Sequence, residues 1–184
     1  MRFIMADLNP SLEVRINPYS NNIIFMDGEF TGLYPDGTEF LSLALINSEG
    51  HELYLELSEY DPSRINDWVK INVLPRLTQE KVTKEEAKRC ITQFVGSQKP
   101  YLVADVNDFD WMGICGLFGV FEQPFHYIPI DFATILFANG IDPDYNRIDL
   151  ARALGIDTSK YKQHHALDDA RILKKMYDKI RVIE

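Results

Sequence analysis

The chain has 184 residues, of which 46% are hydrophobic and 12% aromatic, and its formal net charge at pH 7 is −9. This composition excludes a disordered protein, and the length suits one domain that buries roughly two-thirds of its unfolded surface. The acidic excess argues against a broad basic surface that grips duplex nucleic acid, although bound divalent cations can reverse the charge locally.

The N-terminal residues are the least regular part of the chain, because Asn-Pro pairs and a Ser-Asn-Asn run interrupt any pattern. We expect an N-terminal arm over residues 1–22 and a single domain over residues 23–184. Polar residues come too early for a signal peptide, and no apolar run reaches the ~20 residues of a membrane span. The protein is therefore expected to be cytoplasmic, without a membrane partner.

The domain opens with three predicted strands. They cover residues 23–26, 40–46 and 53–57, with turn residues between them. Strands joined by short turns indicate an antiparallel meander.

The periodicity then changes to an alternation of helices and strands. Helices are expected over residues 65–77, 83–95, 110–118, 132–138, 148–154 and 166–180, and strands over 101–104 and 127–130. Thr83 with Glu86 three residues later is a capping box that opens the second helix. Strands first and alternation afterwards predict an α/β fold, a mixed sheet with helices on its faces.

Asp27 and Glu29 form the first acidic cluster, at the end of an apolar strand. A strand repeats every two residues, so both carboxylates are expected on one face, with Gly28 pointing away. A solvated strand end or an Asp-Gly turn is the alternative interpretation.

Asp110 follows a predicted strand and opens a helix, which is a common place for a functional carboxylate in an open α/β sheet. Asp105 and Asp108 are rivals nearby. Asp105 would lie at the strand end itself and stays a second candidate.

The third cluster lies where the last helix begins. Asp169 is predicted at the edge of the apolar helix face, whereas Asp168 is expected to point to solvent and act as N-terminal charge. His164, in the preceding polar loop, has an ordinary pKa of ~6.5 that suits proton transfer near neutrality. His165 competes for this role, and spacing alone does not separate the two.

Four converging carboxylates repel one another unless cations lie between them, so the clusters predict a metal site. Oxygen ligands favour two Mg²⁺ or Mn²⁺ ions over zinc, and such ions perform phosphodiester chemistry.

The three clusters together resemble the motifs of a known family. The pattern DxE at residues 27–29, FD at 109–110 and HxAxxD at 164–169 resembles the DEDDh (DnaQ-like) 3′-5′ exonucleases, which include RNase T and oligoribonuclease. The resemblance spans residues 23–182 and implies a ribonuclease-H-like fold. The second motif lacks the His-Asn pair of many members, and the chain is similar to a small bacterial exoribonuclease subgroup known from mycobacteria.

The resemblance also implies roles for individual residues. Asp27, Glu29, Asp110 and Asp169 would hold the metals, and its register selects His164 as the general base. The terminal nucleotide would meet the segment composed of Phe30, Thr31, Gly32 and Leu33. Leu33 or Phe30 would wedge against its base, with core packing as the alternative.

We therefore expect a 3′-5′ exonuclease that releases nucleoside 5′-monophosphates from single-stranded 3′ ends, RNA in preference to DNA. Relatives suggest a homodimer. The rival hypotheses are a catalytically silent nucleic-acid-binding module, and an endonuclease or phosphodiesterase that uses the same ions. Trp68 is interpreted as a packing residue, and Lys160, Lys162 and Arg171 as candidate phosphate contacts.

Overall fold

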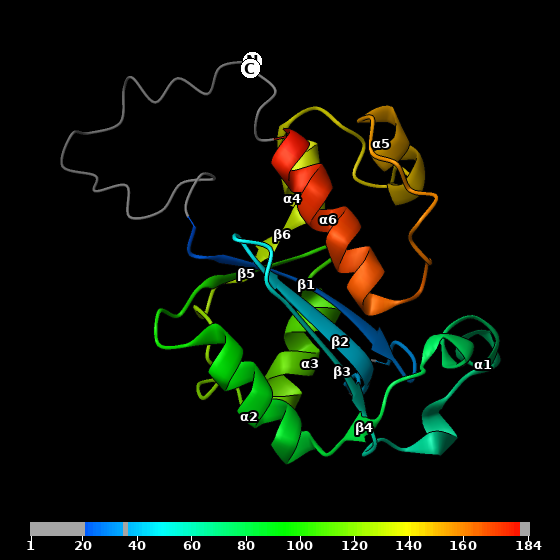
Figure 1. Ribbon diagram of the computed structural model, residues 1–184, viewed down its shortest axis with the longest axis vertical. Coiled ribbons are helices and arrows are strands. Elements are labelled where there is room, and N and C mark those ends of the chain that lie inside the picture. The colour runs from blue at the N-terminus through cyan, green and yellow to red at the C-terminus, as the bar shows by residue number, and fades with distance from the viewer. Residues whose placement is uncertain (1–20, 35–36, 181–184) are drawn as a thin grey trace.

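The computed structural model describes residues 21–34 and 37–180 (Figure 1). The arm expected over residues 1–22 thus lies almost wholly outside the described residues.

A six-stranded mixed sheet forms the centre of the fold (Figure 1). Its order is β4-β3-β2-β1-β5-β6. The antiparallel pairs β1–β2 and β2–β3 confirm the predicted meander, and the other pairs are parallel. The strands are β1 (Ile23–Phe30), β2 (Phe40–Asn47), β3 (Glu52–Leu57), β4 (Lys81–Val82), β5 (Tyr101–Ala104) and β6 (Ile130–Asp131).

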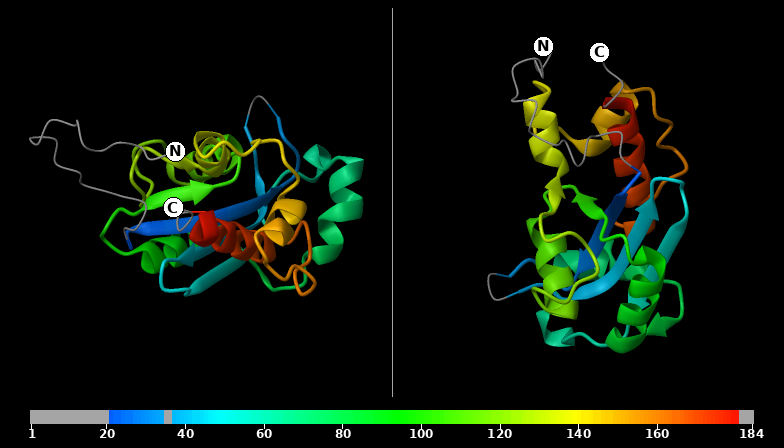
Figure 2. Two further views of the ribbon diagram at one scale, coloured as in Figure 1. Left: turned by 90° about the horizontal axis from the view of Figure 1, so that it is seen from above. Right: turned by 90° about the vertical axis from the view of Figure 1, so that its left-hand side faces the viewer.

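Helices cover both faces of this sheet, as Figures 1 and 2 show. One core lies between the sheet and α4, α5 and α6, and a second lies between the sheet and α2 and α3. The helices are α1 (Asp67–Asn72), α2 (Lys84–Val95), α3 (Asp108–Phe118), α4 (Phe132–Ala138), α5 (Arg147–Ala153) and α6 (Ala166–Ile180), with the 3₁₀ turns η2 (Pro62–Arg64) and η3 (Leu74–Arg76). The capping box of Thr83 and Glu86 is present at α2.

The alternation of β1 decides which side chains face which helix. Ile23 and Phe25 join the core under α6, whereas Ile24 and Met26 join the core over α3. A strand alternates strictly, so Asp27 and Glu29 belong to the α6 face and Gly28 to the α3 face.

Several expected elements differ from those observed. β1 continues to Phe30, four residues beyond the predicted strand, α3 begins two residues before the predicted helix, and β4 has no predicted counterpart. The helix predicted over residues 65–77 is instead α1 followed by η3, because Pro75 cannot donate to a continuing helix and crowds the preceding turn. The strand predicted over 127–130 is shortened to β6, since Pro129 has no amide hydrogen for a ladder bond.

Among the helices of the described residues, none has the length and apolar character that crossing a membrane requires.

Candidate functional site

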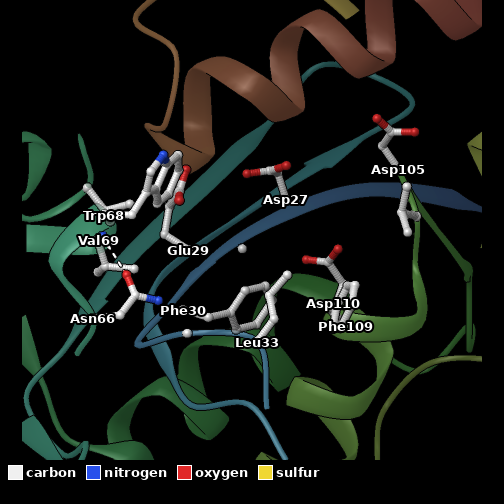
Figure 3. A pocket seen from close by; sticks show the side chains of 14 residues that line it. Asp27, Glu29, Phe30, Leu33, Asn66, Trp68, Val69, Asp105, Phe109 and Asp110 are labelled. Atoms are coloured by element: carbon white, nitrogen blue, oxygen red, sulfur yellow. Dashed lines mark hydrogen bonds between the residues drawn. The ribbon is translucent and has the colours of Figure 1, made fainter. Parts of the chain in front are cut away.

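The fold brings the three polar clusters together where β1 ends. Asp27 and Glu29 extend from β1, Asp110 lies in the first turn of α3, and Asp169 lies in the first turn of α6. Figure 3 shows Asp27 and Asp110 pointing toward a shared space. The convergence follows from the topology, because β1 is central and α3 and α6 begin on its opposite faces at the same end.

Gly28 lets α3 approach the strand. A Cβ at this position would lie 2.6 Å from Cε1 of Phe40 and 3.0 Å from Oδ1 of Asp110. The neighbouring side chains therefore leave no room for a methyl group, and the glycine sets the distance between Asp110 and β1.

Gly28→Ala is expected to destabilise the fold by about 1–3 kcal/mol through overpacking, and to displace Asp110 from the acidic cluster. Urea unfolding measures the first effect, and the affinity of the protein for Mn²⁺ measures the second. Gly116→Ala is the control, since no atom lies within 4 Å of the added Cβ and alanine favours a helix by up to about 1 kcal/mol. Equal stability of the two variants would contradict the packing argument.

Three side chains are close enough to share one cation. Ligand-capable atoms of Glu29, His164 and Asp169 all lie within 4.8 Å of one another. Burial, together with the charge of Asp169, raises the pKa of Glu29 to about 8. Burial also raises the pKa of Asp169 to about 6, partly offset by backbone amides of His164 and His165.

Asp27 and Asp110 extend the same negative field. Burial raises the pKa of Asp27 well above its usual range, and the charges of Asp169, Asp110 and Glu29 add to the shift. Burial also raises the pKa of Asp110 well above its usual range, and the charges of Asp105 and Glu29 raise it further. Oδ1 of Asp110 is buried without a hydrogen-bond partner, so the site has an oxygen available for a ligand. Such a set of carboxylate oxygens fits hard divalent cations.

The raised pKa values predict how the stability of the metal-free protein depends on pH. A carboxyl group with a raised pKa keeps its proton in the folded state after the unfolded state has released it. The free energy of unfolding in EDTA should therefore begin to fall at about pH 4, where unfolded Asp and Glu ionise, and continue to fall until the pH has passed the folded pKa values of Asp169 (about 6) and Glu29 (about 8).

Urea unfolding at several pH values measures this slope, and added Mn²⁺ should restore more stability at the alkaline end than at the acid end. A free energy of unfolding in EDTA that rises over this range would contradict the crowding of these carboxyl groups.

Asp105 and Asp108, the alternative candidates to Asp110, are less suited to hold a cation. Both carboxylate oxygens of Asp105 accept hydrogen bonds from Arg147, at 2.6 and 2.8 Å, so this carboxylate is already paired. Asp108 is exposed. Asp105 and Asp110 both line the cleft, but Asp110 is 5% exposed and has a buried oxygen without a hydrogen-bond partner, which favours it over both alternatives.

The two histidines point to different surroundings. The His164 ring meets Trp68 edge-on at 4.8 Å between centroids, while its backbone N–H donates to Asp169 at 2.8 Å. The His165 ring instead stacks on Tyr54. His164 has a φ of 60°, a strained conformation that turns its side chain toward the acidic cluster. The geometry thus distinguishes the two residues where spacing could not.

The expectation that Asp168 points to solvent is wrong. Asp168 is only 8% exposed. Its carboxylate accepts a hydrogen bond from the backbone amide of Lys162 at 3.0 Å and forms an ion pair with Arg171 at 2.9 Å. Arg171 also binds Glu52, so it is not free to contact a phosphate. Asp168 is buried because the loop before α6 folds back over the helix start.

A cleft of about 640 Å³ leads from the acidic cluster. Phe30, Gly32 and Leu33 line it, and Leu33 is 57% exposed. Phe30 stacks on Phe40, with the ring centroids 5.0 Å apart, so it combines core packing with cleft lining. Thr31 is fully buried and does not line the cleft.

Further lining comes from the start of α1, where the sequence predicts no residue of the site. Asn66, Trp68 and Val69 line the cleft from the start of α1. Trp68 is 52% exposed, so its interpretation as a packing residue is wrong. No sequence signal marked this exposure, because periodicity predicted one helix over residues 65–77 in place of the short α1.

Comparison with known proteins finds local sequence similarity and a shared fold. No family model matches the chain. Curated 3′-5′ exoribonucleases of Mycobacterium tuberculosis, strains CDC 1551 and H37Rv, are 30% identical to it over 104 residues, which is 52% of this chain and 60% of each relative. The match therefore spans less than two-thirds of those proteins.

The solved structures that resemble the chain are of exonuclease I. The zinc-bound complex of Escherichia coli exonuclease I with single-stranded DNA has a TM-score of 0.65 at 19% identity, covering 86% of this chain and 40% of that chain. The complex of the same enzyme with a dT13 oligonucleotide has a TM-score of 0.64 at 17% identity, covering 87% and 41%. The predicted ribonuclease-H-like α/β fold is thus confirmed, and the chain is similar in sequence to the mycobacterial 3′-5′ exoribonucleases.

Proposed function

We propose that this protein is a metal-dependent 3′-5′ exonuclease that acts on single-stranded RNA. The observation that carries the proposal is the meeting of Asp27, Glu29, Asp110, Asp169 and His164 in two adjoining pockets that share Asp27. The similarity to mycobacterial exoribonucleases over part of the chain supports the choice of RNA over DNA.

Asp27, Glu29, Asp110 and Asp169 would hold two Mg²⁺ or Mn²⁺ ions, since their oxygens are crowded and Asp110 has one without a partner. When bound, these ions would activate the attacking water and stabilise the departing oxygen.

His164 would act as the general base. Burial lowers its pKa, and the nearby Arg76 lowers it further, so its imidazole is neutral at pH 7 and can accept a proton. Its ring packs against Trp68, which limits its rotation beside the carboxylates. A neutral base in a fixed position suits proton removal from a water molecule.

The cleft would hold the 3′-terminal nucleotide. Phe30 and Leu33 offer apolar surface on one wall, and Trp68 offers an indole on the other. Contact with the flat face of a base is worth ~1–3 kcal/mol and does not depend on which base is present. The cleft therefore suits stepwise removal of nucleotides without sequence preference. The homodimer and the cytoplasmic location stay predictions.

The test is digestion of matched RNA and DNA oligonucleotides, labelled at the 5′ or the 3′ end, with Mn²⁺, Mg²⁺ or EDTA. A ladder from the 5′ label, immediate mononucleotide from the 3′ label and no reaction in EDTA are expected, with RNA degraded faster. Internal cuts would instead indicate an endonuclease. Binding without cleavage under all conditions would indicate a silent binding module.

A further inference from the structure

Arg76 is an exposed cation at the edge of an acidic site. It ends the turn η3, which continues from the cleft wall formed by α1. Among the described residues its guanidinium has no ion-pair or hydrogen-bond partner. An unpaired arginine is conspicuous in a chain with a net charge of −9.

The position of Arg76 is close to the candidate base. The same wall segment places the Trp68 ring 4.8 Å from the His164 ring, between centroids. The charge of Arg76 also contributes to the lowered pKa of His164. Val73, three residues before Arg76, lines the cleft, so the geometry of this wall segment also places the cation on the His164 side of the cleft.

The other arginines around the site have partners. Arg147 is paired with Asp105, and it also donates to the carbonyls of Pro143 and Tyr145. Arg171 is held between Glu52 and Asp168. Of these three arginines, only Arg76 is free to bind an anion.

A buried carboxylate fixes the chain directly after Arg76. Glu56, only 1% exposed, accepts hydrogen bonds from the amides of Thr78 at 2.8 Å and Gln79 at 2.9 Å. Val73, just before η3, is buried. The turn is therefore anchored on both sides, so Arg76 loses little backbone freedom when it binds a ligand.

We propose that Arg76 binds a backbone phosphate at one of the two 3′-terminal linkages of a single-stranded RNA. A nucleic-acid chain that enters this cleft brings negative charge toward four carboxylates, and a preplaced guanidinium offers charge-assisted hydrogen bonds to a phosphate. This inference rests on the proposed function, because it assumes that the chain enters the same cleft.

Binding can be measured without turnover in the Asp27→Asn background, with a 5′-fluorescein RNA pentamer, fluorescence anisotropy and Mn²⁺ present. Adding Arg76→Gln should raise Kd about tenfold, the effect of losing one charge-assisted hydrogen bond. The slope of log Kd against log salt concentration should fall by about 0.7, the value for one phosphate contact on a single strand. Arg76→Lys keeps the charge, so its Kd should lie between that of the protein with Arg76 and that of Arg76→Gln.

Arg89→Gln is the matched control, since Arg89 is an exposed arginine on α2, and it should leave Kd and the salt slope unchanged. Pentamers with one uncharged methylphosphonate locate the contact. The Asp27→Asn protein that keeps Arg76 should bind one of the two 3′-terminal analogues about tenfold more weakly than unmodified RNA. After Arg76→Gln is added, that analogue and unmodified RNA should bind with equal affinity.

An Arg76→Gln protein with unchanged Kd and salt slope would overturn this inference, as would a methylphosphonate effect that persists in the variant. Failure of the proposed function gives a different result, namely absence of turnover in the parental protein, and the binding measurements still decide the role of Arg76. Undetectable binding of RNA by the Asp27→Asn protein that keeps Arg76 would overturn both this inference and the proposed function.

Discussion

Asp27→Asn is expected to abolish RNA degradation while leaving the fold at least as stable as that of the parent. The carboxylate faces Asp169, Asp110 and Glu29 at close range, and burial raises its pKa further. The ionised form is thus unfavourable in the folded metal-free protein, and a neutral amide of the same shape removes this cost. The same change removes one carboxylate oxygen from the proposed metal set, so activity and stability should move in opposite directions.

Turnover of labelled RNA and urea unfolding in EDTA at neutral pH measure the two effects. Asp108→Asn is the matched control, because Asp108 is exposed and lies two residues from Asp110. This control should keep both parental activity and parental stability. An Asp27→Asn protein that degrades RNA at the parental rate would refute the assignment of the site.

His164→Ala is expected to slow turnover by roughly 10²–10⁴, the usual contribution of a general base, while metal binding persists. The lowered pKa of His164 has a further consequence. The parental rate should rise with pH through a value below the ordinary range of histidine, because only the neutral imidazole accepts a proton. The His164→Ala protein should not show this rise of the rate with pH. Single-turnover rates measured over a series of pH values test this expectation.

His165→Phe is the control for this variant, because phenylalanine preserves the ring that stacks on Tyr54. Its activity should stay near the parental value. If His165→Phe lost the activity and His164→Ala kept it, the register of the third motif would be wrong by one residue.

Local patterns were sufficient for most of the secondary structure. The strand β5 and the helices α4 and α6 have the bounds that periodicity predicts, because each alternates or repeats its apolar residues without interruption. Strand alternation also placed Asp27 and Glu29 on one face, since the geometry of a strand is independent of its neighbours. Pro75 and Pro129 account for two of the elements that differ, through a missing amide hydrogen.

The sequence by itself therefore determined the fold class and the order of the three acidic clusters, because both depend on local periodicity and short motifs. Only the tertiary structure decided which neighbouring charged side chains are paired and which are available to the proposed site. Asp105 is paired with an arginine 42 positions away, and Arg171 with a glutamate 119 positions away. The exposure of Trp68, and the lack of a partner for Arg76 among residues 21–34 and 37–180, likewise depend on how η3 and α1 lie against the loop before α6. Such contacts join residues that are distant in sequence, so no local pattern contains them.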